Sequence, residues 1–292
     1  MVEVDALSAL DLLLWLGRGA EVSARLQMNQ STVSRKAAAA SKAFDLKLKR
    51  TSEGWDLLGD LELVRLERLV HQVWRLKQIQ GLRLDADAWL GQSLLNGDQS
   101  PGLITGCYHH LNHHQPLRLL RERVLDGWLT ILGKECLNGD YADLTIMELG
   151  ELPLELLVDH AHPLTQQSGL ELNDLLRFPR LNQASGVVPW FEAEVRNRGL
   201  WDSPVTARYY SPDDWEGRTA TNAAILYGHS LTRTLHPSLV PLNFALGLRV
   251  PISLVVHRQN AEQAAVQQLK NWLAVQLAQH AAQHPELQLA AD

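Results

Sequence analysis

The first helices of the chain can be placed from the spacing of its apolar residues. Residues 5–16, DALSALDLLLWL, put leucines on one helical stripe, and Gly17 and Gly19 then end the run. A second short helix fits residues 20–27, where apolar side chains lie four positions apart. The pattern therefore predicts two consecutive helices separated by a glycine break.

A polar turn follows and leads into a third predicted helix. Asn29 and Ser31 are both acceptable helix caps, so the helix begins there and continues through four alanines to about Phe44. Residues 46–58, LKLKRTSEGWDLL, then alternate apolar and basic side chains around a glycine turn, as in a two-stranded ribbon. Three helices and a ribbon within about 55 residues predict a winged helix-turn-helix.

Residues 61–80 predict a long helix with a narrow apolar seam. Leu66, Leu69, Val73 and Leu76 recur at spacings of three, four and three, while the other faces carry charges. A narrow seam of this kind, with two apolar positions in every seven residues, suits a partner helix better than a domain core. We therefore expect a linker helix that dimerises through these four residues.

After Gly81 short apolar segments alternate with helical ones, which indicates an α/β body. Crossings near 158–163 and 248–256 would divide that body into two lobes with a cleft between them. The predicted strands are 82–84, 103–107, 128–132, 154–159, 181–183, 207–210 and 252–257, and the predicted helices are 88–95, 116–125, 170–175, 189–198, 213–227 and 261–282.

The expected fold class is an α+β multidomain protein. It has an N-terminal winged helix-turn-helix, a linker helix and a two-lobed α/β effector domain shaped like a periplasmic binding protein. The expected boundaries are 1–60, 61–80 and 81–292, with lobe I at about 81–158 and 257–292 and lobe II at about 159–256.

Charge is distributed unevenly along the 292 residues. Between Arg18 and Arg50 the chain has eight bases and two acids, a local charge of +6. Because the net charge of the whole chain is −6, the remaining residues together carry a charge of −12. Nucleic acid attracts basic surfaces, and a small basic module on an acidic body is the pattern expected when only the first part meets DNA.

Residues 26–35, LQMNQSTVSR, resemble the helix-turn-helix of the LysR-type transcriptional regulators. That family usually has leucine, valine, serine and glutamine, then alanine and an aliphatic residue, and finally serine and arginine. The apolar positions, the glutamine and the serine-arginine pair match here without a gap. The resemblance implies a homodimer or homotetramer that binds double-stranded DNA through its wings and holds a small effector in the cleft. The two cysteines and the lack of a signal-peptide or membrane pattern separately lead us to expect a cytoplasmic protein.

If the third helix enters a major groove, its first turn faces base edges and the surrounding bases contact phosphates. Gln30 could pair with adenine and Arg35 with guanine, while Thr32 offers a methyl group to thymine. The other reading is a capped surface helix without a DNA partner. The candidate DNA-binding residues are Gln30, Ser31, Thr32, Ser34, Arg35, Lys36, Lys42, Lys47, Lys49 and Arg50.

The resemblance also implies effector-binding positions in the cleft. They fall on Asp85, Asp87 and Trp89, on Gln183 and Ser185, and on Thr219. An aspartate at a helix N-terminus would disfavour a carboxylate ligand through like-charge repulsion. The alternative is that Asp85 or Asp87 caps the helix and binds no ligand.

Four histidines crowd into YHHLNHHQP. His109 with His113, and His110 with His114, are spaced i, i+4, which on a helix would place two imidazoles on one face as metal ligands. The alternative is a solvated loop that titrates near neutral pH. The two cysteines, Cys107 and Cys136, could likewise form a redox pair or be two buried apolar groups.

Other classes of function lack a signal. No G-x-S-x-G, P-loop, HExxH or dinucleotide motif occurs, so we expect no enzyme and no cofactor. No apolar run is long enough for a membrane helix, and the first residues carry acids where a signal peptide has bases. The alternative function is a small-molecule or metal-binding protein of periplasmic-binding-protein shape whose helix-turn-helix serves only dimerisation.

Overall fold

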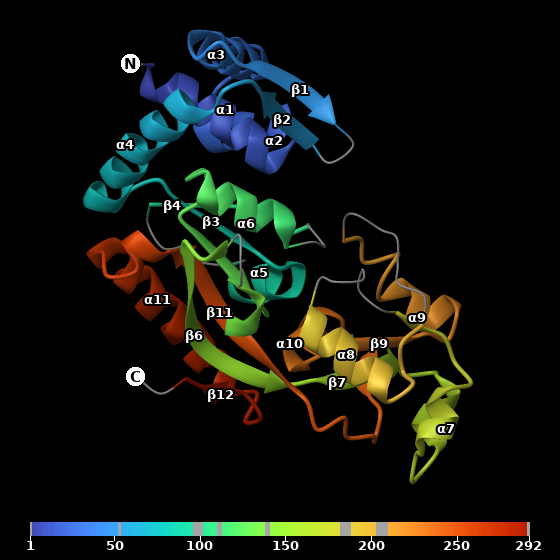
Figure 1. Ribbon diagram of the computed structural model, residues 1–292. Helices are drawn as coiled ribbons and strands as arrows, with labels where there is room; N and C mark the ends of the chain where they lie inside the picture. The colour runs from blue at the N-terminus through green and yellow to red at the C-terminus, as the bar shows by residue number, and fades with distance from the viewer. Residues whose placement is uncertain are drawn as a thin grey trace.

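The computed structural model describes residues 2–51, 54–95, 102–109, 113–137, 141–181, 188–202 and 210–290. It has a small N-terminal module, a connecting helix and a larger α/β part (Figure 1). We call residues 2–58 the head and residues 82–290 the body. This organisation confirms the predicted fold class.

The head is a winged helix-turn-helix. Gly17 ends the first helix with a φ of 71°, and Gln27 makes the turn between the second and third helices with a φ of 52°. The ribbon strands pair in antiparallel fashion, Lys47 opposite Leu58. The elements are α1 (Val4–Leu16), α2 (Gly19–Leu26), α3 (Gln30–Ala43), β1 (Lys47–Thr51) and β2 (Gly54–Leu58).

Two sheets form the body, one in each lobe. The described strands of lobe I are ordered β12-β6-β11-β5-β3-β4, and those of lobe II are ordered β10-β7-β9-β8. The strands of lobe I are β3 (Leu82–Ala86), β4 (Leu103–Thr105), β5 (Gly127–Thr130), β6 (Leu144–Pro153), β11 (Arg249–His257) and β12 (Gln288–Leu289). Those of lobe II are β7 (Glu155–Asp159), β8 (Arg180–Leu181), β9 (Ile225–Gly228) and β10 (Leu239–Pro241).

Helices cover both sheets (Figure 1). α4 (Glu62–Gln78) connects the head to the body and ends at Ile79, whose φ is 52°. The body helices are α5 (Ala88–Leu94), α6 (His114–Arg121), α7 (Leu172–Leu175), α8 (Pro189–Asn197), α9 (Gly217–Thr221), α10 (Ser230–Leu235) and α11 (Ala264–Ala281). Short 3-10 turns lie at Lys134–Cys136, Pro163–Gln166 and Arg258–Asn260.

The predicted lobe boundaries are wrong by several residues. Only Leu154 separates β6 of lobe I from β7 of lobe II, so the first crossing precedes 158–163. On the return, β11 pairs with β6 along its whole length, and so 249–256 belong to lobe I. Within residues 144–159 the local signals are Gly150 and Pro153, and Pro153 directly precedes the crossing.

Further body elements differ from the sequence-based prediction, and α10, β10 and β12 were not predicted at all. The helix expected over 213–227 is interrupted by Ala223, which has a φ of 47°, and its last residues form the buried strand β9. β6 was not predicted as a strand, although its burial alternates over part of its length. Short apolar runs of this kind fit a helix or a strand equally well until their partners are known.

α1 is buried on all sides. Ten of its residues are buried, among them Asp11 and Trp15, because one face packs on α3 and the other on lobe I. Ala37 and Ala40 of α3 are fully buried against it, so small side chains are matched by a close approach of the two helices. One continuous apolar core consequently joins head and body.

Among the described residues, no helix has both the length and the apolar character needed to cross a membrane.

Candidate functional site

The outer face of α3 carries most of the polar residues predicted to contact DNA. Gln30, Ser31, Ser34 and Arg35 are exposed, and Thr32 is half-buried. α3 lies on the side of α1 away from the body (Figure 1). These side chains therefore stand where a long ligand can approach without meeting the body.

Local contacts fix the start and orientation of this helix. Asn29 is the N-cap residue, as predicted, although its side chain makes no capping hydrogen bond. The hydroxyl of Ser23 donates to the carbonyl of Met28 and so ties α2 to the turn. Arg35 donates to the hydroxyl of Thr32 at 3.3 Å, which holds its guanidinium along the first turns of α3.

Lys36 does not stand free on this face. Its ammonium group lies 3.1 Å from Glu3 Oε2 and 3.5 Å from Asp5 Oδ2. The hydrogen bond with Glu3 raises the pKa of Lys36, so the group stays charged, but both acids compete with a phosphate for it. The sequence-based prediction that Lys36 contacts DNA did not include this pairing, because both acids lie at the start of α1, more than 30 residues away.

The remaining predicted cations surround α3 and the wing. Lys42, Lys47, Lys49 and Arg50 are exposed. Arg50 lies 5.9 Å from the ring centre of Trp55, whose Nε1 donates to Gly17 O at 3.1 Å. The indole thus anchors the wing to the end of α1 and supports one cation over its face.

A buried ion cluster fixes the head to the body. Asp11 of α1 is completely buried and accepts from Arg68 Nε at 2.8 Å and from Arg83 Nη1 at 3.1 Å. Burial alone would raise the pKa of Asp11, but the two guanidinium groups outweigh it and hold that pKa below its usual value. Arg68 also contacts Glu122 at 3.1 Å. This cluster therefore connects α1, α4, β3 and the end of α6.

A second buried cluster surrounds Asp126. Arg75 donates to both carboxylate oxygens at 2.9 Å, and Gln72 donates at 3.0 Å. The backbone N–H of Arg83 completes the set at 2.9 Å. Both clusters draw the polar face of α4 inward, an arrangement that the sequence pattern did not predict.

The exposed side of α4 consequently carries a set of apolar residues, together with the exposed charged residues Glu62, Arg65 and Lys77. Leu63, Leu66, Val70, Val73 and Trp74 are 40–62% exposed. We call these five residues the α4 outer face.

The seam predicted for this helix is only partly correct. Leu66 and Val73 do lie on the α4 outer face, but Leu69 is half-buried and Leu76 is only 6% exposed, within the chain's own core. The inward pull of Arg68 and Arg75 sets this rotation, and charge patterning along the helix alone does not reveal it.

Asp85 serves the junction between head and body and does not face the cleft. Its carboxylate accepts from Trp15 Nε1 of α1 at 2.7 Å and from the backbone of Ala86 at 2.9 Å. Arg25 of α2 adds a bond to Thr105 O at 3.0 Å. The effector-binding role expected for Asp85 is therefore wrong.

The carboxylate of Asp87 is hydrogen-bonded to residues of its own lobe. It accepts from the hydroxyl of Thr130 at 2.7 Å and from the backbone N–H of Ile131 at 3.0 Å. Burial raises its pKa to about 6. Asp87 is the N-cap residue of α5, as in the alternative interpretation, although its side chain makes no cap bond.

Trp89 crosses the cleft. Its Nε1 donates to Glu216 Oε1 of lobe II at 2.8 Å, and the hydroxyl of Tyr210 donates to the other carboxylate oxygen at 2.9 Å. Thr219 is buried and donates to Glu216 O at 2.6 Å, so its hydroxyl is engaged in its own helix. Gln183 and Ser185 lie outside the described residues.

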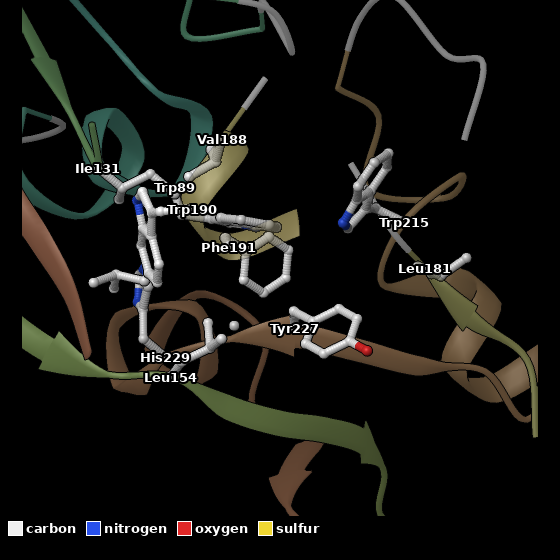
Figure 2. Close-up of a pocket in the computed structure, with 12 residues that line it drawn as sticks. Trp89, Ile131, Leu154, Leu181, Val188, Trp190, Phe191, Trp215, Tyr227 and His229 are labelled. Carbon is white, nitrogen blue, oxygen red and sulfur yellow. The ribbon is translucent and has the colours of Figure 1, made fainter. Parts of the chain in front are cut away.

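Behind Trp89 the cleft contains a hollow lined by aromatic side chains from both lobes (Figure 2). Among the residues described, it is a hollow between the two lobes in the predicted cleft.

The histidine cluster does not assemble as predicted. No group of three or more potential metal ligands occurs among the residues that the structure describes, and His110 lies outside them. His113 precedes α6 and is buried, which lowers its pKa to about 4, while His114 contacts the hydroxyl of Tyr141 at 3.2 Å. Because α6 begins at His114, the i, i+4 spacing of His109 and His113 does not fall on one helix.

Cys107 and Cys136 do not form a disulfide. Burial raises the pKa of Cys107 to about 11, the opposite of what a reactive thiolate requires. The raised pKa of Cys107 thus favours the alternative of a buried apolar group for this residue.

The fold is similar to that of solved full-length LysR-type regulators. A full-length OxyR variant from Pseudomonas aeruginosa is 15% identical, with a TM-score of 0.55 over 94% of each chain. ArgP from Mycobacterium tuberculosis is 14% identical, with a TM-score of 0.53 over 94% of this chain and 97% of that one. A full-length BenM variant is 17% identical, with a TM-score of 0.51 over 100% and 99%.

At this level of identity the comparisons show the fold alone. No protein-family model matches the sequence, and no curated protein gives a significant match.

Proposed function

We propose that this protein is a DNA-binding transcription regulator of LysR type, that it acts as a homo-oligomer, and that a small molecule in the inter-lobe cleft modulates it. The observation that carries the proposal is the exposed face of the head. There Gln30, Ser34 and Arg35 project from α3, and cations of the wing lie on the same module. Groups that read base edges and groups that contact phosphates are thus combined on one small domain.

The α4 outer face supports the homo-oligomer. Its five apolar residues form a stripe along a helix whose buried arginines, Arg68 and Arg75, are already paired inside the protomer. A contiguous exposed apolar stripe typically marks a surface that another apolar surface covers. A second copy supplies a matching stripe through a two-fold contact.

Arg35 provides the first test of whether the protein recognises a specific DNA sequence. Once the bound sequences have been found by genome-wide mapping, Arg35→Ala should weaken binding to such a site by about 1–3 kcal/mol if the guanidinium contacts a base. The wing variant Lys49→Ala is the control, because loss of a phosphate contact weakens specific and nonspecific binding alike. Unchanged affinity of Arg35→Ala for the mapped site would remove Arg35 from the interface.

The pairing of Lys36 leads to a gain-of-affinity prediction. Glu3 and Asp5 are 79% and 60% exposed and lie beside the proposed DNA-contacting face, so Glu3→Gln with Asp5→Asn should strengthen duplex binding severalfold at low salt. The change releases Lys36 and removes two negative charges near the phosphates. Asp213→Asn with Asp214→Asn alters the net charge equally in exposed residues of lobe II and should leave affinity unchanged. Equal effects of the two double variants would contradict a local role.

A further inference from the structure

The hollow in the cleft is built mainly from aromatic rings. Residues of both lobes contribute, and Figure 2 shows the rings of Trp190 and Phe191 on one side and Trp215 on the other, with Tyr227 below. The remaining lining is largely aliphatic. The lining side chains are Trp89, Ile131, Leu154, Leu181, Val188, Trp190, Phe191, Trp215, Tyr227, His229 and Val250.

No charged side chain lines this hollow among the residues described. Glu216 is a buried carboxylate that contacts the lining residue Trp89. It already accepts hydrogen bonds from Trp89 and Tyr210. His229 is deeply buried, and burial lowers its pKa to about 4, so the imidazole is neutral at physiological pH. An anionic ligand would therefore lose its hydration without gaining a counter-charge.

Three buried nitrogen atoms of residues that line the hollow have no hydrogen-bond partner in the described structure. Trp215 is 2% exposed with an unpaired Nε1, and in Figure 2 this nitrogen faces the hollow. His229 is also 2% exposed, and its Nε2 is unpaired, as is Nε1 of Trp190. Buried polar groups in folded proteins are nearly always bonded to protein, water or ligand, so three such atoms in one apolar site need an explanation.

The three nitrogens act as donors. The two indole nitrogens can only donate. In His229 the other ring nitrogen, Nδ1, lies 3.4 Å from the hydroxyl of Thr232, which accepts from the backbone N–H of His229 and so has its own proton free to donate. Assigned in this way, the single proton of the neutral ring sits on Nε2.

We propose that the hollow binds a flat, uncharged aromatic compound with a carbonyl oxygen that accepts from Trp215 Nε1 or His229 Nε2. Such a compound would be the effector of the regulator proposed above, so this site rests on that proposal. Stacking on several rings supplies the affinity, and the donors select an acceptor of hydrogen bonds.

The dimensions of the site favour a thin ligand. Including the open solvent at its mouth, the hollow measures about 460 Å³, but only about 20 Å³ is free for the centre of a water molecule with the rings as they stand. Binding of a single planar ring would therefore require the aromatic side chains to turn aside.

Three probes of similar shape test the proposal by isothermal titration calorimetry. Acetophenone is a neutral aryl ketone, benzoate is its anionic counterpart, and α-methylstyrene replaces the carbonyl oxygen with a methylene. Acetophenone should bind, α-methylstyrene should bind about tenfold more weakly because one hydrogen bond is lost, and benzoate should bind weakest. Equal affinity for ketone and alkene, or tighter binding of benzoate, would overturn the proposal without the need for any variant.

Trp215→Phe keeps an aromatic ring and removes the donor. If Trp215 is the donor that the ligand uses, the affinity of the Trp215→Phe protein for acetophenone should fall by about five- to tenfold. The affinity of this variant for α-methylstyrene should be retained. Trp272→Phe, on α11 outside the hollow, should change neither. If Trp215→Phe leaves the ketone unaffected, His229→Phe must produce the loss, and retention in both variants contradicts the assignment.

Duplex binding measured on the same preparation separates this site from the proposed function. A protein that binds duplex but none of the three probes retains the regulator proposal and refutes the ligand class. A protein that ranks the probes as expected but does not bind duplex retains the site and refutes the regulator.

Discussion

Replacing Asp11 with Ala lowers the free energy of unfolding by about 3–5 kcal/mol. The carboxylate is fully buried between Arg68 and Arg83, which are 0% and 3% exposed. Its removal leaves two guanidinium groups without their main counter-charge in a place that water does not reach. Urea denaturation gives the loss as a lower midpoint at an unchanged slope.

The matched control for Asp11 is Glu62→Ala, an acid on the exposed side of α4, which should stay within about 0.5 kcal/mol of the parent. A double-mutant cycle with Arg68→Met should show strong coupling, because removing both partners of a buried pair costs less than the sum of the two single changes. Additive effects, or a loss below about 1 kcal/mol for Asp11→Ala, would show that the cluster does not hold head and body together.

The second large effect is expected on the α4 outer face. Leu66→Glu with Val70→Glu should convert the homo-oligomer into a monomer of 32.7 kDa, as measured by light scattering after size-exclusion chromatography. Both side chains are more than half exposed in the protomer, at 55% and 61%, so the protomer itself should remain folded. The new carboxylates would face one another across a two-fold contact and repel.

Lys42→Glu controls for charge in this experiment. It changes the net charge by the same two units on an exposed residue of the head and should leave the mass unchanged. Retention of the parent's oligomeric mass by the α4 double variant would show that another surface joins the protomers.

The local elements of the head could be predicted from sequence because short-range signals specify them. The glycine break after α1, the polar turn before α3 and the basic ribbon all follow from residues next to one another, and the motif from Leu26 to Arg35 indicated the fold class. The lobe boundaries were less accessible, because residues 144–159 contain only Gly150 and Pro153 as turn signals.

The junction between head and body could not be predicted from sequence. Asp11 meets partners 57 and 72 positions away, and the bond between Trp15 and Asp85 spans 70 positions. One signal was nevertheless present. A single carboxylate within the apolar run ALDLLLWL needs a buried partner, and arginines at helical spacing in α4 were available for it. The rotation of α4, and with it the exposed face of Leu63 and Val70, follows from that pairing.

The proposal that the head binds DNA through α3 and the wing is tested most directly by titrating the full-length protein with a nonspecific duplex at two salt concentrations. The exposed cations of the head should release counterions, so affinity should fall on the order of 100-fold or more between about 50 and 200 mM salt. Lys42→Glu with Lys49→Glu should greatly weaken the binding at low salt and flatten its salt dependence. No detectable binding at low salt, or an affinity that salt does not change, would contradict the account.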